Sequence, residues 1–319
     1  MTLAKVLLSR RRCGQILAGA VFNRWFRRAF ASERHLNWGA APGPGEGHER
    51  RYRATAQILV LSLPLVRWSN VGGGSAVWRE AGSPDDGLLR FLEFTGFSNP
   101  EHAAGLNRLG FIREMSRLKP GTAAECLYFG LMTASPEETA EEARQSLHPK
   151  SKEAAYTAID GHLDGAGMET VIAHFTAPAN WSVANRNDLV QLARTALAAT
   201  PSRTPEGNAR GEIRPFLVTL ADALRQAAPA QARFVYGGRF YRLSLQRSPD
   251  PKTTGSFRQR GLLDVGKQLV RVSGKLRRES GGKETDFRLW VEDGAAQPLP
   301  LRIEYQARSY LRLIFDAEA

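Results

Sequence analysis

The residues whose spacing most suggests chemistry are three consecutive glycines, Gly72 to Gly74, in the segment NVGGGSAVWRE (70–80). Glycine loops that cradle phosphate follow a strand and open a helix, whose N-terminus attracts the anion. Here the segment AVWR (76–79) favours a strand, and no lysine followed by serine or threonine comes after the glycines. We therefore interpret the glycines as a bend or bulge in a coiling strand. A close approach to a ligand and a hairpin connection after Trp68 are the alternatives.

The histidines and cysteines do not form a pattern for metal binding or nucleophilic catalysis. The six histidines include no pair at the i, i+4 spacing of a helical metal site, and two cysteines cannot complete a zinc site. Cys126 lies in the apolar strand pattern ECLYFGLM (125–132), so we expect a buried, inert thiol. No Gly-x-Ser-x-Gly motif occurs. The sequence predicts no metal, no cofactor and no catalytic residue.

Two polar loops hold the best candidates for contact with a ligand or a surface. The first, 98–114, is a glycine-bearing stretch between apparent strands, and the second, 247–261, is rich in basic residues. Loops of that size on a rigid scaffold often carry function. The candidate residues are His102, Asn107, Arg108, Arg113, Arg258 and Arg260. The alternative is that both loops are solvated connectors.

Basic residues alternate with apolar ones in the C-terminal third, which would give a sheet one cationic face. They are Arg271, Lys275, Arg277, Arg278, Arg288, Arg302 and Arg312. Such a face suits anionic lipid head groups, or it is simply solvated. Proteins that bind single-stranded nucleic acid expose aromatic side chains among their cations, whereas the aromatics here fall on the apolar phase, with Trp290 the chief exception. We expect no nucleic-acid partner.

The order of apolar patterns predicts the elements that position these residues. A β block spans 50–134, a helical block spans 135–228, and a second β block spans 232–316. Within the helical block the spacing predicts helices at 135–147, 152–163, 188–199 and 212–227, with a strand at 168–175. The second β block opens with a hairpin on Gly237-Gly238 and continues as a meander with one apolar and one wet face.

Because these blocks do not alternate as βαβ units, we predict an α+β fold. Its two β blocks form one strongly curved antiparallel sheet, a half-barrel, and the intervening helical block packs on the concave face. The helix at 212–227 is the clearest case because it carries an apolar stripe that must be buried. The stripe consists of Ile213, Phe216, Leu217, Leu220 and Leu224.

The first 49 residues differ from the rest of the chain. Seven basic residues and no acid fall within 1–31, and removing them lowers the formal net charge from +12 to +5. The motif Ser9-Arg10-Arg11, a short apolar run and Ala29-Phe30-Ala31 indicate an export signal, or alternatively a basic arm or a mis-assigned start. The segment 32–49 is interpreted as a flexible linker, which leaves 50–319 as a single domain. The longest apolar run, 58–66, is far shorter than the roughly 20 residues of a membrane span, so no span is expected.

The C-terminal segment FRLWVEDGAAQPLPLRIEYQARSYLRLIFDAE (287–318) resembles the final β-meander of uncharacterised bacterial envelope proteins. A strand ending near Trp290, a turn, and Leu299-Pro300 before the last hairpin carry the likeness, which extends loosely to 50–97. The resemblance implies a curved half-barrel, distantly like the lipoprotein-carrier fold, with a helix on its concave side. It also implies export and a hydrophobic cavity, and it transfers no catalytic residue.

Together these features predict a non-enzymatic binding or structural protein, exported to the periplasm or cell envelope, that holds an apolar or lipid-like ligand. An anionic membrane surface is a second expected partner. Two alternatives stay open: an enzyme with a dispersed site in the loops 98–114 and 247–261, and a cytoplasmic basic binding protein.

Overall fold

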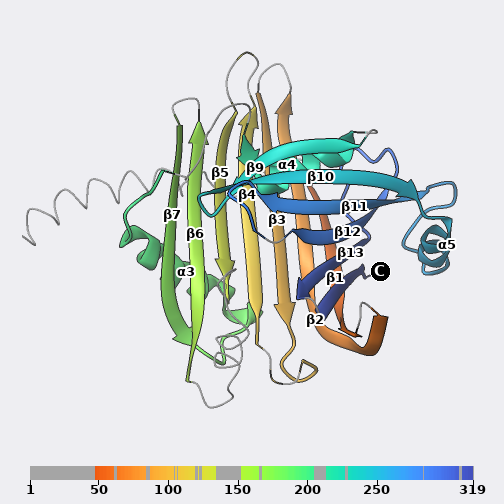
Figure 1. Cartoon of the computed structure of the whole chain (residues 1–319), viewed down its shortest axis with the longest axis horizontal. Coiled ribbons are helices and arrows are strands. Elements are labelled where there is room, and N and C mark those ends of the chain that lie inside the picture. Colours follow the sequence, from red (N-terminus) through yellow and green to blue (C-terminus); the bar gives the residue numbers. More distant parts are fainter. Residues whose placement is uncertain are drawn as a thin grey trace, which may run out of the picture. The chain divides into compact units, whose positions relative to one another are not determined.

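The computed structural model describes residues 47–60, 63–83, 87–103, 105, 107–118, 121, 124–133, 152–164, 167–204, 213–226, 229–282, 284–308 and 311–318. Within this part of the chain, strands form one fourteen-stranded sheet in the order β7-β6-β5-β4-β3-β2-β1-β14-β13-β12-β11-β10-β9-β8. Neighbouring strands are antiparallel except β8 and β9. The sheet is curved and unclosed, with β7 at one edge and β8 at the other (Figure 1). The predicted curved sheet made from two distant β blocks is therefore confirmed.

Seven strands form what we call the N-terminal run. They are β1 (Gly47–Val60), β2 (Leu63–Ser83), β3 (Gly87–Ser98), β4 (Leu109–Leu118), β5 (Glu125–Met132), β6 (Glu153–Asp164) and β7 (Gly167–Pro178). The other seven form the C-terminal run. They are β8 (Arg214–Pro215), β9 (Ala230–Tyr236), β10 (Arg239–Pro249), β11 (Leu269–Arg278), β12 (Thr285–Glu292), β13 (Arg302–Arg308) and β14 (Leu311–Ala317).

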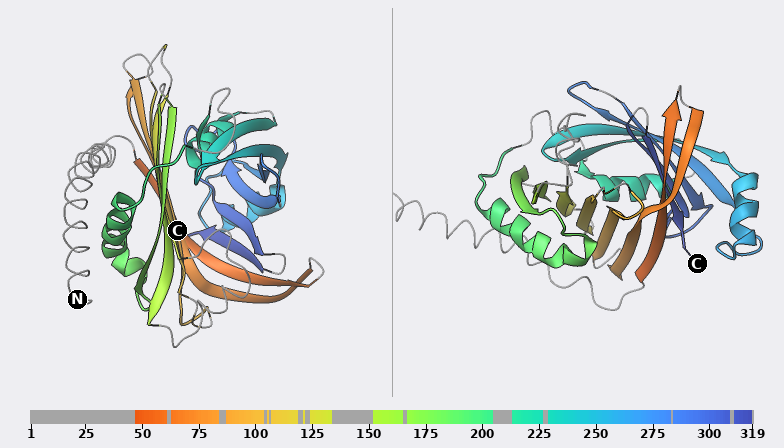
Figure 2. Two further views of the ribbon diagram at one scale, coloured as in Figure 1. Left: turned by 60° about the vertical axis from the view of Figure 1, so that its left-hand side comes forward. Right: turned by 90° about the horizontal axis from the view of Figure 1, so that it is seen from below.

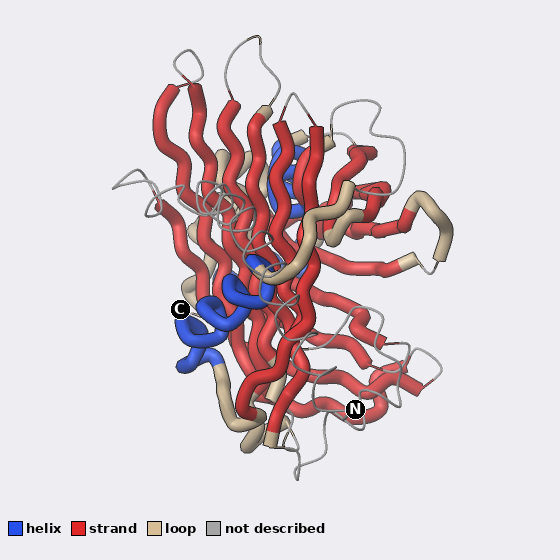
Figure 3. The backbone as a smooth tube through the Cα atoms, turned by 90° about the vertical axis from the view of Figure 1, so that its left-hand side faces the viewer, coloured by secondary structure: helices blue, strands red, loops and turns tan. Residues whose placement is uncertain are grey.

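The two runs are joined where the first strand pairs with the last. Tyr52 lies opposite Ala317, and Ile58 lies opposite Leu311. Beyond this seam the sheet folds back, so that the strands of the C-terminal run cross those of the N-terminal run (Figures 1 and 3). Alternate residues of each strand point to the same side of the sheet. The apolar residues on the inner side of one run therefore face those on the inner side of the other.

The helices occupy different sides of this sheet. α3 (Arg186–Ala198), preceded by a 3-10 turn (Val183–Asn185), packs on β6 and β7 on the side away from the C-terminal run (Figures 2 and 3). α4 (Phe216–Arg225) lies between the two runs and contacts β3, β4 and β9. α5 (Pro251–Gln259) follows β10 and packs on β11.

The helical block predicted for 135–228 is wrong in part. The segment 152–163, expected to be a helix, is strand β6, and the expected strand at 168–175 is β7. Strand β6 is covered on both faces: Tyr156 and Ala158 pack toward α3, while Ile159 and Leu163 pack toward β9 and β10. A strand buried on both faces lacks polar alternation, so its apolar residues fell by chance at helical spacing. Packing of a helical block on the concave face is not confirmed, since of the described helices only α4 lies between the runs.

Other predicted segments have different bounds in the structure or lie outside the described residues. The helix expected at 188–199 is α3, and that at 212–227 is the shorter α4. The helix expected at 135–147, the export signal and the linker as far as residue 46 lie outside the described residues. β1 begins at Gly47, three residues before the expected start of the folded part.

The three glycines lie inside β2, as the bend interpretation predicted. A Cβ atom on Gly72 would stand 2.0 Å from the carbonyl oxygen of Phe97, and one on Gly74 would stand 2.6 Å from that of Thr95. The register of β1 and β2 shifts beside them, between Ala54 and Ala56. The glycines therefore permit close strand packing at a bulge, where a side chain would collide with the backbone. The predicted Gly237-Gly238 hairpin is also confirmed, with positive φ angles of 55° and 67°.

Candidate functional site

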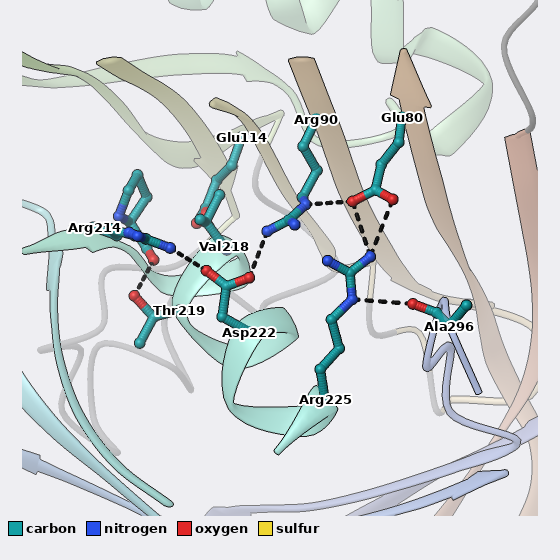
Figure 4. A network of polar contacts seen from close by, with 10 residues as sticks. Glu80, Arg90, Glu114, Arg214, Val218, Thr219, Asp222, Arg225 and Ala296 are labelled. Atoms are coloured by element: carbon teal, nitrogen blue, oxygen red, sulfur yellow. Dashed lines mark hydrogen bonds and ion pairs between the residues drawn. The ribbon is translucent and has the colours of Figure 1, made fainter. Parts of the chain in front are cut away.

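A chain of charged side chains fastens α4 to the N-terminal run. Arg90 of β3 is only 2% exposed, and its Nε donates to Glu80 Oε1 at 2.7 Å while its Nη1 donates to Asp222 Oδ1 at 2.6 Å (Figure 4). Asp222, on α4, also accepts a hydrogen bond from Arg214. Glu80 accepts two further hydrogen bonds, at 2.9 and 3.0 Å, from Nη2 of Arg225 at the end of the helix. Five groups of alternating charge thus link β2, β3, β8 and α4.

The indole ring of Trp78 lies within this chain of charges. The guanidinium carbon of Arg90 is 5.5 Å from the ring centroid of Trp78, and that of Arg225 is 4.7 Å away. A cation near an aromatic face is attracted by the ring quadrupole, more strongly where water is excluded. Trp78 itself is 2% exposed, so the two arginines pack against a buried ring.

Glu114 of β4 holds the start of α4. Its side chain is fully buried, and its Oε2 accepts a hydrogen bond at 2.8 Å from the backbone nitrogen of Val218. The residue before the helix is Pro215, which makes no side-chain cap, so a carboxyl group about a hundred residues earlier serves in its place. Burial raises the pKa of Glu114 to about 8, although the amides at the start of α4 oppose this shift.

Buried side chains with raised pKa values surround Glu114. Burial raises the pKa of the Cys126 thiol to about 12, which makes it the inert cysteine that the sequence predicted. Burial also raises the pKa of Tyr128 and Tyr236. The Tyr128 hydroxyl contacts Thr170 Oγ1 at 2.5 Å, while Glu114 Oε1 and the Tyr236 hydroxyl have no hydrogen-bond partner among the described residues.

The C-terminal end of α4 is held by the opposite run. Arg247 of β10 donates to the carbonyl oxygen of Leu224 and lies 3.9 Å from Asp293. Arg225 adds a hydrogen bond from its Nε to the Ala296 carbonyl at 3.0 Å. The arginines at the end match the polarity of the helix dipole, and the carboxyl group at the start supplies a hydrogen-bond acceptor. α4 is therefore fastened by polar groups at both ends.

The sides of α4, in contrast, make apolar contacts with both runs. Toward the C-terminal run, Phe216 and Leu224 pack in a cluster with Phe234 and Leu243, and the rings of Phe216 and Phe234 lie 5.0 Å apart. Toward the N-terminal run, Val218 and Ala221 pack on Trp78 and Leu92. α4 thus lies between apolar side chains of both runs and has polar contacts near its two ends.

Three of the four candidate residues of the first loop engage neighbouring segments. Asn107 Nδ2 donates to the carbonyls of Ala179 at 2.9 Å and Trp181 at 2.6 Å. Arg108 Nη1 donates to the Thr133 carbonyl at 2.8 Å. Arg113 binds Glu93 Oε2 through Nε at 3.0 Å and Nη2 at 2.9 Å, whereas His102 is exposed in a turn. Their role as a contact surface stays a prediction.

The second candidate segment, 247–261, is an ordered end of β10 followed by α5. Asp250 caps the helix by accepting from Thr253 N at 3.0 Å, and it also accepts from Trp290 Nε1 at 2.8 Å. Arg258 donates to the Lys267 carbonyl, and Arg260 donates to the Ala317 carbonyl at 2.8 Å. The sequence Asp250-Pro251 is a signal for a capped helix start that could have revealed α5. These contacts are to other segments than those of the first loop, so the candidates do not gather in one site.

Many cations of the C-terminal run are paired with acids. Glu279 accepts from Arg233 at 2.7 Å and from Arg242 at 3.1 Å. Further ion pairs of this run join Lys275 with Glu284, Arg288 with Glu304, and Arg302 with Asp316. Trp290, expected on the wet phase, is 5% exposed. The face is thus a mixed-charge surface with an excess of cations.

Sequence reasoning missed the chain of charges around α4. Arg90 and Glu114 point to the buried side of their strands. On β3, Arg90 shares this side with the buried Leu92. A charged residue at an apolar phase is a detectable signal. Glu80 lies near Arg90 in sequence, but the partners on α4, Asp222 and Val218, lie more than a hundred residues away, and no local pattern connects them.

The described residues contain no helix long and apolar enough to cross a membrane, and no group of three or more histidine, cysteine or acidic side chains that could hold a metal ion.

Comparisons with known proteins leave the family open. No family model and no curated protein matches the chain. A solved structure, the crystal structure of a beta-barrel-like protein of domain of unknown function DUF1849 from Brucella abortus, is similar over 85% of this chain and 95% of its own, with 8% sequence identity and a TM-score of 0.41. A similarity at this level supports no functional inference.

Proposed function

We propose that this chain is a non-enzymatic protein, exported to the bacterial envelope, that binds an apolar or lipid-like ligand between the two runs of strands. The observation that carries the proposal is the position of α4, which separates two apolar walls and is fastened mainly by polar groups at its ends. If α4 withdraws, Phe234 and Leu243 on one wall and Trp78 and Leu92 on the other can contact an apolar ligand, while Arg90 and Glu114 lose their partners on the helix. Burial of apolar surface contributes about 25 cal/mol per Å², so an apolar ligand would replace the helix favourably.

The polar loops predicted for an enzymatic alternative support this choice. Asn107, Arg108, Arg258 and Arg260 all donate to backbone carbonyls of neighbouring segments. Side chains engaged in this way favour a structural role. No specific observation favours the alternative of a cytoplasmic basic binding protein.

Export rests on the sequence of residues 1–31. Their basic patch, short apolar run and Ala29-Phe30-Ala31 support a cleaved signal. A fusion of residues 1–40 to a reporter that is active only after export should give reporter activity. A fusion without reporter activity would contradict export.

The ligand is tested with the full chain purified without detergent. Native mass spectrometry should find about one lipid per chain, and a fluorescent fatty acid should compete with it. The variant Asp222→Asn removes the carboxylate that binds both Arg90 and Arg214, so α4 should withdraw more readily and the fatty acid should bind faster.

A matched control removes an ion pair away from α4. Glu279→Gln breaks the contacts with Arg233 and Arg242 and should leave fatty-acid binding unchanged. Circular dichroism should show that both variants stay folded. Absence of both co-purified lipid and fatty-acid binding in all three proteins would contradict the proposed function.

A further inference from the structure

The hairpin of β1 and β2 extends beyond the rest of the sheet. We define the arm as its described end, residues 56–60 and 63–68. β2 pairs with β3 only from Gly72 onward, so before that residue its described pairing is with β1 alone. β1 pairs with β14 only as far as Ile58. The two strands curve away together from the other strands of the N-terminal run (Figure 2).

A bulge at the base of the arm sets its direction. Ala54 pairs with Gly72 and Ala56 pairs with Trp68, so β2 contains extra residues opposite Thr55. Asn70, among these extra residues, has a φ of 60°, in the left-handed region that asparagine tolerates better than most residues. Bulges bend a strand and are built features of a fold, so the projection of the arm is specified by the sequence.

One side of the arm continues an apolar surface of the sheet. Trp68 lies opposite Ala56, which lies opposite Leu313, and Leu313 lies opposite Tyr305. The next row joins Val66, Ile58 and Leu311. Three of these side chains are unusually exposed for their size: Trp68 at 50%, Tyr305 at 40% and Val66 at 38%. Large apolar side chains gathered on an exposed surface mark an interaction site.

The opposite side of the arm is cationic. Arg67 lies opposite Gln57, which lies opposite Arg312. Within the arm Arg67 is the charged residue, and neither aspartate nor glutamate occurs among its described residues. The arm therefore carries apolar side chains on one side and arginine on the other. If its end enters an anionic lipid bilayer edge-on, the tryptophan ring can lie at head-group depth while guanidinium groups on the other side reach phosphates.

We propose that the arm docks the protein on an anionic lipid surface, with Val66 and Trp68 entering the head-group layer and Arg67 and Arg312 binding lipid phosphates. Charge complementarity selects this partner over a protein surface, which would have to supply acids around an apolar centre. The inference does not depend on the ligand proposed above, because the arm lies at the end of the hairpin and the ligand would lie at α4.

The test uses the full chain and vesicles of phosphatidylcholine with or without one quarter phosphatidylglycerol. In flotation assays the wild-type protein should bind the anionic vesicles, and the variant Val66→Ser/Trp68→Ser should bind at least about tenfold more weakly, because two apolar side chains no longer leave water. Arg67→Glu should weaken binding to anionic vesicles and leave the weak binding to neutral vesicles unchanged.

A matched control and a local probe separate the arm from the basic segment 1–31. Leu192→Ser/Val265→Ser removes two other exposed apolar side chains and should bind as the wild type does. A polarity-sensitive dye on Val66→Cys, in a Cys13→Ser background, should shift to the blue on adding anionic vesicles, and the same dye on Val265→Cys should not.

Three results would overturn the proposal. The first is an unchanged affinity of Val66→Ser/Trp68→Ser for anionic vesicles. The second is a dye at position 66 that stays in water while the protein floats with the vesicles. The third is a change in sedimentation showing that the same variant dissociates a dimer without affecting vesicle binding. None of these results bears on whether a lipid co-purifies at α4, so the two proposals fail separately.

Discussion

At the scale of single residues, Glu114 is the most constrained group in the described structure. It is completely buried, it caps a helix from another part of the chain, and its pKa is raised to about 8 by burial. A raised pKa in the folded state means that folding favours the protonated acid. Its contribution is therefore intact below its ordinary pKa of 4.5 and is lost as the pH rises through about 8.

This linkage predicts the behaviour of Glu114→Gln, which keeps an acceptor for Val218 and cannot ionise. Between pH 5.5 and pH 8.5 the wild-type free energy of unfolding should fall relative to that of the variant, by an amount on the order of a few kcal/mol. Burial also raises the pKa of Asp160, to about 6, which lowers the free energy of unfolding of both proteins over a lower pH range. The quantity to follow in urea titrations is therefore the difference between the free energies of unfolding of the two proteins. Parallel pH profiles would contradict this prediction, because they would show that folding does not shift the pKa of Glu114.

At the scale of elements, the bulge at the base of the arm gives a direct test of backbone strain. Asn70 has a left-handed conformation that costs a residue such as alanine about 1–2 kcal/mol. Asn70→Ala should lower the free energy of unfolding by about that amount in denaturant titrations, whereas Asn70→Gly should stay close to the wild type. If alanine were tolerated as well as glycine, the bulge would not hold Asn70 in this conformation.

The same scale shows where sequence patterns succeed and fail. The alternation in β10 to β12 was readable because one face is buried and the other is wet, with Leu243 and Leu245 inside and Arg242 outside. In β6, burial on both faces removed that alternation, and Ala155, Ile159 and Leu163 imitated a helix. The start of α4 was placed too early, at Glu212, because its actual beginning is set by Pro215 and a distant carboxyl group.

At the scale of the whole described part, the fold depends on contacts between segments at opposite ends of the sequence. Arg53 binds Glu318, 265 residues later, beside the pairing of β1 with β14. The sequence predicted two β blocks in one curved sheet, since each block has its own periodicity. It could not predict the contacts of Arg90 and Arg214 with Asp222, because no local pattern relates these strands to α4. Such non-local pairing predicts slow folding.

The claim on which the functional account depends is that α4 can leave the space between the two runs when an apolar ligand enters. Hydrogen exchange of the backbone amides of α4, measured with and without a saturating fatty acid, tests this most directly. The account predicts faster exchange in residues 216–225 with the ligand bound, while β3 and β10 keep their protection. Unchanged or slower exchange of α4 in the ligand-bound protein would contradict it.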